Sequence, residues 1–175
     1  SSSSHSSPYV NVSVTATFTA PNGQTKTVKG FWDGGNNYNV RFTPTSQGTW
    51  KYSITSSPSD SGLTKSGSFR VGGARPGNHG FLRRDSSNPY SFVYDDGTRY
   101  FMWGQTYYEI VRTARKDTSW QQGILNSKAK GMTKVRMLIY PWGASGNPDY
   151  PLSYPFNPEN NHDSLDLTHW QKLDE

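Results

Sequence analysis

The sequence predicts a multidomain chain, an antiparallel β-sandwich followed by a βαβ unit, and three observations lead to this fold class. Apolar residues alternate with polar ones in short runs as far as residue 71, with Gly, Pro and Asn between the runs. This spacing is typical of a sandwich of short strands. Helical spacing of apolar residues begins only after residue 110. The composition changes at residues 72–77, Gly-Gly-Ala-Arg-Pro-Gly, so we place the sandwich at residues 9–72 and the second part at residues 73–175.

A serine-rich segment precedes the sandwich. Residues 1–8 are mostly serine, with one histidine and a final proline. Segments of such low complexity are usually flexible, so we expect residues 1–8 to form a flexible N-terminus. The segment is either a cloning remnant or the linker behind a removed export signal.

Five short runs predict the strands of the sandwich. Apolar and polar residues alternate in four of them, as in a half-buried strand, and residues 28–32 form a further short run that ends at Asp33-Gly34-Gly35. Turn residues separate the runs, and Pro21-Asn22-Gly23 supplies a residue that can take a positive φ. The runs are residues 10–18, 28–32, 38–42, 50–54 and 69–71.

The second part begins with a hairpin and continues as strand, helix and strand. Asp95-Asp96-Gly97 is a hairpin signal between two short apolar runs. Tyr100–Gly104 and Val135–Tyr140 are apolar enough for buried strands. Between them, residues 117–130 have helical spacing, and Gly131 suits the left-handed residue that ends a helix. This order predicts two parallel strands joined by a right-handed crossover. The apolar face of the helix would consist of Trp120, Ile124, Leu125 and Ala129, and a last helix begins near Thr168.

Polar and aromatic residues follow both strands of the βαβ unit. Residues just past the carboxyl ends of parallel strands gather at one edge of the sheet, where α/β folds build their sites. We therefore expect a binding site at this edge, partly covered by the long loop of residues 143–167. The residues that follow the two strands are Gln105, Thr106, Tyr107, Tyr108 and Glu109, and then Pro141 and Trp142.

Composition excludes several classes of function. No apolar run is long enough to span a membrane. The net charge of +5 comes from scattered Lys and Arg residues, whereas a surface that binds nucleic acid would cluster them. There is no cysteine, which removes disulfide and thiolate chemistry. The spacing of His162, Asp163, Asp166 and His169 matches no common zinc or calcium site, so we expect neither a metal nor a cofactor.

Several motifs resemble those of apiosidase-like glycoside hydrolases. One set is similar to the Ig-like domain that precedes their catalytic barrel: Phe18-Thr-Ala-Pro-Asn-Gly, Gly30-Phe-Trp-Asp-Gly-Gly, Tyr38-Asn-Val-Arg-Phe-Thr-Pro, Gly48-Thr-Trp-Lys-Tyr and Gly67-Ser-Phe-Arg-Val. A second set resembles the opening of the barrel: Tyr94-Asp-Asp-Gly, Tyr100-Phe-Met-Trp-Gly-Gln-Thr-Tyr-Tyr, Lys134-Val-Arg-Met-Leu-Ile-Tyr-Pro, Tyr154-Pro-Phe and Leu173-Asp-Glu. The resemblance covers nearly the whole chain from Tyr9. It implies an Ig-like sandwich and then a (β/α)8 TIM barrel that cleaves glycosidic bonds in a polysaccharide or its oligosaccharides.

The resemblance also implies that the chain is the N-terminal part of the enzyme. A (β/α)8 barrel takes about 250 residues, and fewer than half of these are present. Glycoside hydrolysis normally needs two carboxylates, which in such barrels come from later strands. We therefore expect no catalytic residue in this chain, and expect the remainder of the barrel from the same gene product or a companion chain. The enzyme would be secreted, periplasmic or attached to the cell surface.

Six residues are the candidates for substrate binding. Aromatic rings can stack on the C–H faces of sugars, which is favoured for Trp142 because it follows a strand end. Glu109 either accepts a hydrogen bond from a sugar hydroxyl or starts a helix. Arg136, inside the second strand, either orients a catalytic carboxylate or points outward and pairs there. The candidates are Gln105, Tyr107, Tyr108, Glu109, Arg136 and Trp142.

A second class of function fits the same sequence. The chain could be a non-catalytic protein whose sandwich binds carbohydrate or matrix. Two carboxylates at the ends of later strands, in the remainder of the gene or in a companion chain, would decide for the enzyme.

Overall fold

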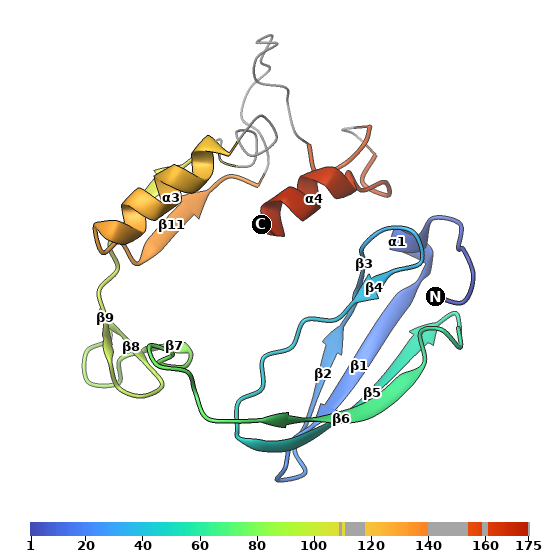
Figure 1. Ribbon diagram of the computed structural model, residues 1–175, viewed down its shortest axis with the longest axis horizontal. Helices are drawn as coiled ribbons and strands as arrows, with labels where there is room; N and C mark the ends of the chain where they lie inside the picture. The colour runs from blue at the N-terminus through green and yellow to red at the C-terminus, as the bar shows by residue number, and fades with distance from the viewer. Residues whose placement is uncertain (109, 111–117, 140–153, 159–160, 175) are drawn as a thin grey trace. The chain divides into compact units, whose positions relative to one another are not determined.

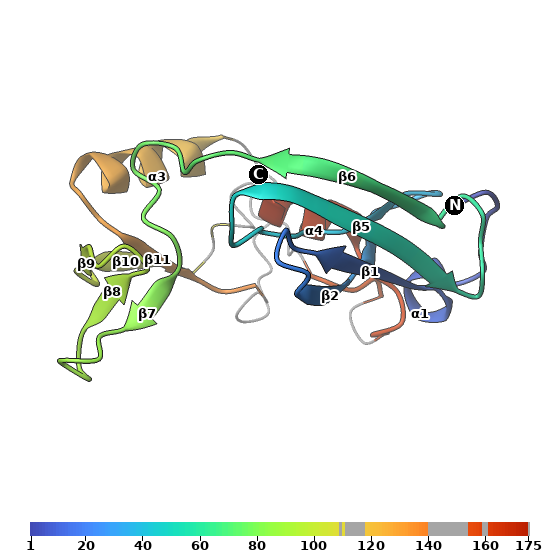
Figure 2. The same ribbon diagram turned by 90° about the horizontal axis from the view of Figure 1, so that it is seen from below.

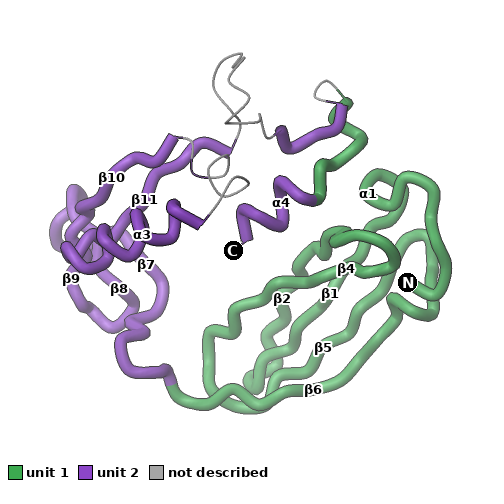
Figure 3. The backbone as a smooth tube through the Cα atoms, turned by 45° about the horizontal axis from the view of Figure 1, so that its top comes forward, with its two compact units in different colours: residues 1–73, 160–167 green, residues 74–159, 168–175 purple. Residues whose placement is uncertain are grey.

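The computed structural model describes residues 1–108, 110, 118–139, 154–158 and 161–174. These residues form two compact units. Unit 1 comprises Ser1–Gly73 and Asn160–Leu167, and unit 2 comprises Ala74–Glu159 and Thr168–Glu175 (Figure 3). We describe each unit by itself.

The main sheet of unit 1 has four antiparallel strands. Its spatial order is β2-β1-β5-β6, so β1 and β5 are central and β2 and β6 are edges (Figure 2). Gly23, with φ of 83°, closes the β1–β2 hairpin, and its N–H donates to the Ala20 carbonyl at 2.9 Å. The strands are β1 (Ser13–Thr19), β2 (Thr25–Lys29), β5 (Gly48–Ser57) and β6 (Lys65–Val71).

A second layer covers part of this sheet. Strand β3 (Phe31–Trp32) pairs antiparallel with β4 (Tyr38–Asn39). Past β4, Phe42 stacks on Phe18 of the main sheet with ring centroids 3.9 Å apart. One buried cluster consists of Ala16, Phe18, Ala20 and Trp50, and a second of Val12, Val14 and Leu63. Two layers around an apolar core are compatible with the predicted sandwich; the Ig-like connectivity stays a prediction.

Several strand boundaries in unit 1 were predicted wrongly; the last strand, for example, starts at Lys65 rather than at Phe69. The first strand starts at Ser13 rather than at Val10, because residues Pro8–Asn11 form the short helix α1, in which Val10 is exposed. The strand expected at residues 28–32 is interrupted at Gly30, which passes so close to Val14 that a Cβ there would lie 3.0 Å from Val14 Cγ1. The strand expected at residues 38–42 ends at Asn39. Residues 1–72, all of which the structure describes, contain no helix longer than two turns, as the lack of helical spacing there predicts; the longest is the four-residue α1.

The serine-rich N-terminal segment has defined partners in the structure. Asp60 is buried, and its Oδ1 accepts hydrogen bonds from the Ser2 N–H at 2.8 Å and the Ser2 hydroxyl at 2.7 Å. His5 Nε2 lies 3.1 Å from Asp60 Oδ2. The flexibility of residues 1–8 stays a prediction, but Ser2 and His5 in this segment both contact the buried Asp60.

Unit 2 opens with a three-stranded antiparallel sheet. Strand β8 (Phe92–Tyr94) pairs with β7 (Leu82–Arg84) on one side and with β9 (Arg99–Tyr100) on the other. The hairpin predicted at Asp95-Asp96-Gly97 is confirmed: Gly97 has φ of 85° and donates to the Tyr94 carbonyl at 2.9 Å. Strand β7 was not predicted.

The βαβ unit follows, and its parallel pairing is confirmed. Strand β10 (Gly104–Tyr107) pairs parallel with β11 (Lys134–Met137), and helix α3 (Ser119–Ala129) connects them (Figure 1). Gly131, with φ of 74°, follows the helix as expected. The first strand was expected at Tyr100–Gly104, but Tyr100 pairs with Phe92 in the hairpin, so the parallel strand starts at Gly104.

Two further points complete unit 2. A last helix was predicted near Thr168, and α4 spans Leu167–Asp174. Strand β11 was expected to be covered on both faces, yet Val135 is 39% exposed and Met137 40% exposed.

None of the helices that the structure describes is both long enough and apolar enough to cross a membrane. A parallel βαβ unit is compatible with the start of a barrel, which itself stays a prediction.

Candidate functional site

The β10–β11 pair has two faces, and hydrogen bonds identify the one that α3 covers. Gln105 Nε2 donates to Ser127 Oγ at 2.8 Å. The Tyr107 hydroxyl donates to the Gly123 carbonyl at 2.7 Å and lies 2.7 Å from Ser127 Oγ. Since side chains alternate along a strand, Gln105 and Tyr107 face the helix, and Thr106 faces away from it.

Gly123 and Ser127 explain how Tyr107 fits beneath α3. They are four residues apart and therefore share one face of the helix. A Cβ at Gly123 would lie 3.3 Å from the Tyr107 ring, tighter than most such contacts, so glycine allows the ring to approach. Ser127 is buried and donates back to the Gly123 carbonyl at 2.9 Å. At Gly123 and Ser127, helix α3 therefore contacts the strand pair through small and polar groups rather than through large apolar side chains.

This arrangement corrects two expectations. Gln105 and Tyr107 were placed past the end of the first strand, but both lie inside β10. Leu125 and Ala129 were assigned to the apolar face of the helix, yet Leu125 is 56% exposed and Ala129 is exposed as well. Ser127 and Gly123 were not predicted, because serine and glycine do not contribute to an apolar spacing. The available signal was a pair of small residues four positions apart.

The opposite face of the strand pair is basic. Thr106 is paired with Arg136 and Gly104 with Lys134, so both cationic side chains belong to the face that turns away from α3. The Arg136 guanidinium carbon lies 5.9 Å from the centroid of the Tyr108 ring, within the range of a cation–π contact. Arg136 and Tyr108 thus form the part of the predicted site that the structure brings together.

The remaining candidates divide into two groups. Gln105 and Tyr107 face α3, whereas Glu109, Pro141 and Trp142, with residues 143–153 and 159–160 of the long loop, fall outside the described residues. Their proposed contacts with a substrate stay predictions. The structure does not test whether Gln105 and Tyr107 contact substrate, but it gives them partners on α3.

The chemistry of the described face is that of recognition. A guanidinium can hold a carboxylate through two parallel hydrogen bonds, and an aromatic ring offers an apolar platform to a sugar. The described residues contain no cluster of three or more His or acidic side chains that could hold a metal ion. The described face therefore has groups that can bind and orient a ligand. The carboxylates that a hydrolase needs would have to come from other residues.

Comparisons with known proteins agree with a carbohydrate-related assignment. The family model of a domain of unknown function, DUF5060, matches residues 1–57. The crystal structure of a candidate glycoside hydrolase from Bacteroides vulgatus matches with a TM-score of 0.80 and 33% sequence identity. The match covers 98% of this chain and 35% of that one. No curated protein matches the chain.

Over nearly its whole length this β-rich chain is therefore similar to a glycoside hydrolase-like protein, and it spans about a third of that protein.

Proposed function

We propose that the chain forms part of a glycoside hydrolase that acts on a polysaccharide or its oligosaccharides. The observation that carries this proposal is the similarity to the Bacteroides vulgatus protein, at 33% identity across 98% of the chain. Since the chain spans 35% of that protein, the activity belongs to a larger assembly of which this chain is one portion. The assembly acts outside the cytoplasm, where polysaccharides are met.

In this proposal, β10, α3 and β11 open a (β/α)8 barrel whose interior is the basic face. In such barrels helices cover the outside of the strands, and the active site lies at the carboxyl ends of the strands. The face of β10–β11 that lacks α3 is then the interior face, and it holds Arg136. Tyr108 directly follows β10 and therefore lies at the carboxyl end of the strand.

Arg136 would orient a carboxylate, and Tyr108 would support it. Glycoside hydrolysis uses a pair of carboxyl groups about 5–10 Å apart, depending on the stereochemical outcome. The described residues of the basic face, Gly104, Thr106, Tyr108, Lys134 and Arg136, include no carboxylate. Both catalytic groups therefore come from residues beyond those of this face. Arg136 would hold one of them ionised, because a neighbouring cation stabilises the charged form of a carboxyl group.

The exposure of β11 supports the need for further strands and helices. Val135 and Met137 pair with Gln105 and Tyr107 and thus share the face that α3 covers. Both are exposed, which leaves apolar surface beside α3. In a barrel the helix that follows β11 would cover them. We propose that this cover comes from the remainder of the same gene product or from a companion chain.

The test compares the complete gene product with residues 1–175 expressed alone. Hydrolysis is measured across a panel of polysaccharides and their oligosaccharides. We expect the complete product to cleave one of these substrates and residues 1–175 to cleave none. Cleavage by residues 1–175 would show that their own carboxylates do the chemistry. A complete product that binds but never cleaves would favour the non-catalytic binding module.

A further inference from the structure

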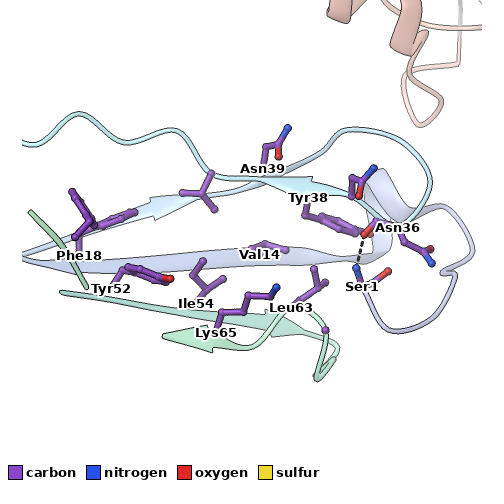
Figure 4. Close-up of a pocket in the computed structure, with 14 residues that line it drawn as sticks. Ser1, Val14, Phe18, Asn36, Tyr38, Asn39, Tyr52, Ile54, Leu63 and Lys65 are labelled. Atoms are coloured by element: carbon purple, nitrogen blue, oxygen red, sulfur yellow. Dashed lines mark hydrogen bonds between the residues drawn. The ribbon is translucent and has the colours of Figure 1, made fainter. Parts of the chain in front are cut away.

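A groove lies between the two layers of unit 1. Its volume is about 480 Å³, within the roughly 300–1,000 Å³ that is common for small-molecule sites. The main sheet forms one wall, and the segment around β4 forms the other (Figure 4). Residues that line it and enter the argument are Tyr38, Tyr52, Ile54, Lys65 and Phe69.

The groove exists because the inner face of edge strand β6 is not filled. Pairing of Ile54 with Lys65, Tyr52 with Gly67 and Trp50 with Phe69 places all three β6 residues on the inner face. Gly67 has no side chain, and a Cβ there would lie 2.7 Å from the Tyr52 hydroxyl. The Tyr52 ring therefore lies over Gly67, close to the sheet. Past β4 the second layer continues with Val40, which also lines the groove, while Phe42 stacks on Phe18 of the central strand β1 rather than on β6.

Charge in the groove has one sign. Lys65 has the one charged side chain among the described residues that line it. The two carboxylates of residues 1–73 are engaged elsewhere: Asp33 accepts from Asn39 Nδ2 at 2.6 Å, and Asp60 holds Ser2. Lys65 is exposed, whereas the Tyr52 and Phe69 rings beside it are partly buried, so the ammonium at this side of the groove is open to a ligand from solvent.

We propose that this groove binds an anionic sugar unit of an oligosaccharide, with the Lys65 ammonium paired to its carboxylate or sulfate group. That the ligand is a carbohydrate rests on the proposed function. That it has an anionic group is inferred from the positive charge of Lys65. The Tyr52 ring gives the C–H face of the sugar an apolar platform, with Phe69 beside it at a ring-centroid distance of 6.5 Å. Aromatic rings together with a few polar groups are the usual lining of such sites. The sandwich would then hold an acidic polysaccharide by a site of its own.

A structural role for Lys65 must be separated from this one. Inward-pointing charges on edge strands prevent the strands of two molecules from pairing, and Lys65 lies on edge strand β6. A negative charge would serve that role equally well, whereas an anionic ligand requires a positive one. Lys65→Glu therefore distinguishes the two.

The experiment uses the complete gene product and isothermal titration with three probes. These are an oligogalacturonate, a sulfated galactan oligosaccharide and a neutral cello-oligosaccharide. We expect an acidic probe to bind more tightly than the neutral one, and its affinity to fall with added salt. The Lys65→Glu change should weaken that binding by roughly tenfold or more, since a hydrogen bond to a charged group is lost. The uronate and sulfate arms identify which anionic group the groove accepts.

Two further variants provide controls. Lys51→Glu makes the same charge change on the outer face of the same sheet, because Lys51 lies between Trp50 and Tyr52 along β5, and it should leave the affinity unchanged. Lys65→Arg keeps the positive charge and should retain binding. The thermal midpoint of each variant is measured to exclude misfolding.

Equal affinity for neutral and acidic probes, or equal loss with Lys65→Glu and Lys51→Glu, would overturn the inference. So would failure of all three probes to bind. The proposed function is judged separately by hydrolysis: cleavage without Lys65-dependent binding removes only this inference, and Lys65-dependent binding without cleavage removes only the hydrolase.

Discussion

The guanidinium of Arg136 lies over the ring of Tyr108, 5.9 Å from its centroid, across the strands β10 and β11. At an exposed site such a contact is worth about 0.5–1 kcal/mol, enough to bias the arginine side chain. The contact thereby links Tyr108, which directly follows β10, to Arg136, which lies within β11. For this reason Arg136 is the described residue that we place first in the proposed active site.

Replacing Arg136 should reduce hydrolysis by the complete gene product. Arg136→Ala removes the group that would orient a carboxylate, and loss of one such donor typically lowers kcat about 100-fold. Arg136→Lys keeps the charge but loses the planar fork, so it should recover only part of the activity. The measurement is kcat and KM on the substrate found in the polysaccharide panel.

Lys134→Ala is the matched control for Arg136. Lys134 is on the same strand and face, two residues earlier, and is paired with Gly104 at the amino end of β10. It should lie away from the carboxyl ends, and its loss should change kcat little. Equal losses from both substitutions would mean that the basic face acts only through its overall charge.

Tyr107→Phe should loosen α3. The hydroxyl donates to the Gly123 carbonyl and contacts Ser127 and Gln105, and its removal leaves partly buried polar groups without this partner. The expected loss is about 1–3 kcal/mol in the opening free energy of α3 amides, measured by hydrogen exchange. Tyr108→Phe, on the other face, should leave these amides unchanged. A raised KM with no change in exchange would instead place Tyr107 in the substrate site.

Asp60 should make the attachment of the N-terminal segment dependent on pH. Hydrogen bonds from the Ser2 N–H and hydroxyl, with those from His5 and Gly62, hold the pKa of Asp60 well below its usual range. The folded-state pKa is thus lower than the unfolded value of roughly 3.9. The stabilisation is therefore complete above that value and is lost as pH falls through the lower folded-state pKa.

Hydrogen exchange of the Ser2 amide tests this prediction. We expect protection at neutral pH in the wild type and much less in Asp60→Asn. Amides of the β8–β9 hairpin, in unit 2, are the internal control for the substitution and should not respond to Asp60→Asn. They do not serve as a control for pH, because hydrogen bonds from Thr98 and His79 lower the pKa of Asp96 in this hairpin. Unprotected Ser2 in the wild type would support the flexible N-terminus that the sequence predicts.

Gly131→Ala should destabilise the end of α3. Gly131 has φ of 74°, a conformation that costs a residue with a side chain about 1 kcal/mol. The expected effect is a loss of this size in the opening free energy of the last turn of α3. Gly72→Ala is the control, because its Cβ would meet nothing within 4 Å. A loss at Gly72 as large as that at Gly131 would mean that the positive φ of Gly131 is not the cause of the effect.

Local signals were enough to predict α3 and the hairpins. Periodicity located α3 to within two residues, and Gly131 and Gly97 take the positive φ that their positions require. Pairing partners decided what local signals could not. Tyr100 is apolar enough to begin a parallel strand, but it is held by Phe92 in the hairpin.

The face on which each site residue lies could not be predicted for the same reason. Alternation separates Gln105 and Tyr107 from Thr106, yet it does not say which set meets the helix. That choice depends on Gly123 and Ser127, which lie on the helix and leave room for Tyr107. The positions of Glu109 and Trp142 stay predictions.

The central place of β1 in the four-stranded sheet determines how unit 1 can fold. Strands β1 and β2 are neighbours in the chain, as are β5 and β6, so each pair can form early as a local hairpin. The pairing of β1 with β5 instead joins Thr19 to Lys51 across β2, β3 and β4. Because loop closure must be completed before such a contact stabilises the chain, we expect the pairing of β1 with β5 to be the slow step. Substitutions along it should alter the folding rate more than substitutions in the hairpin turns.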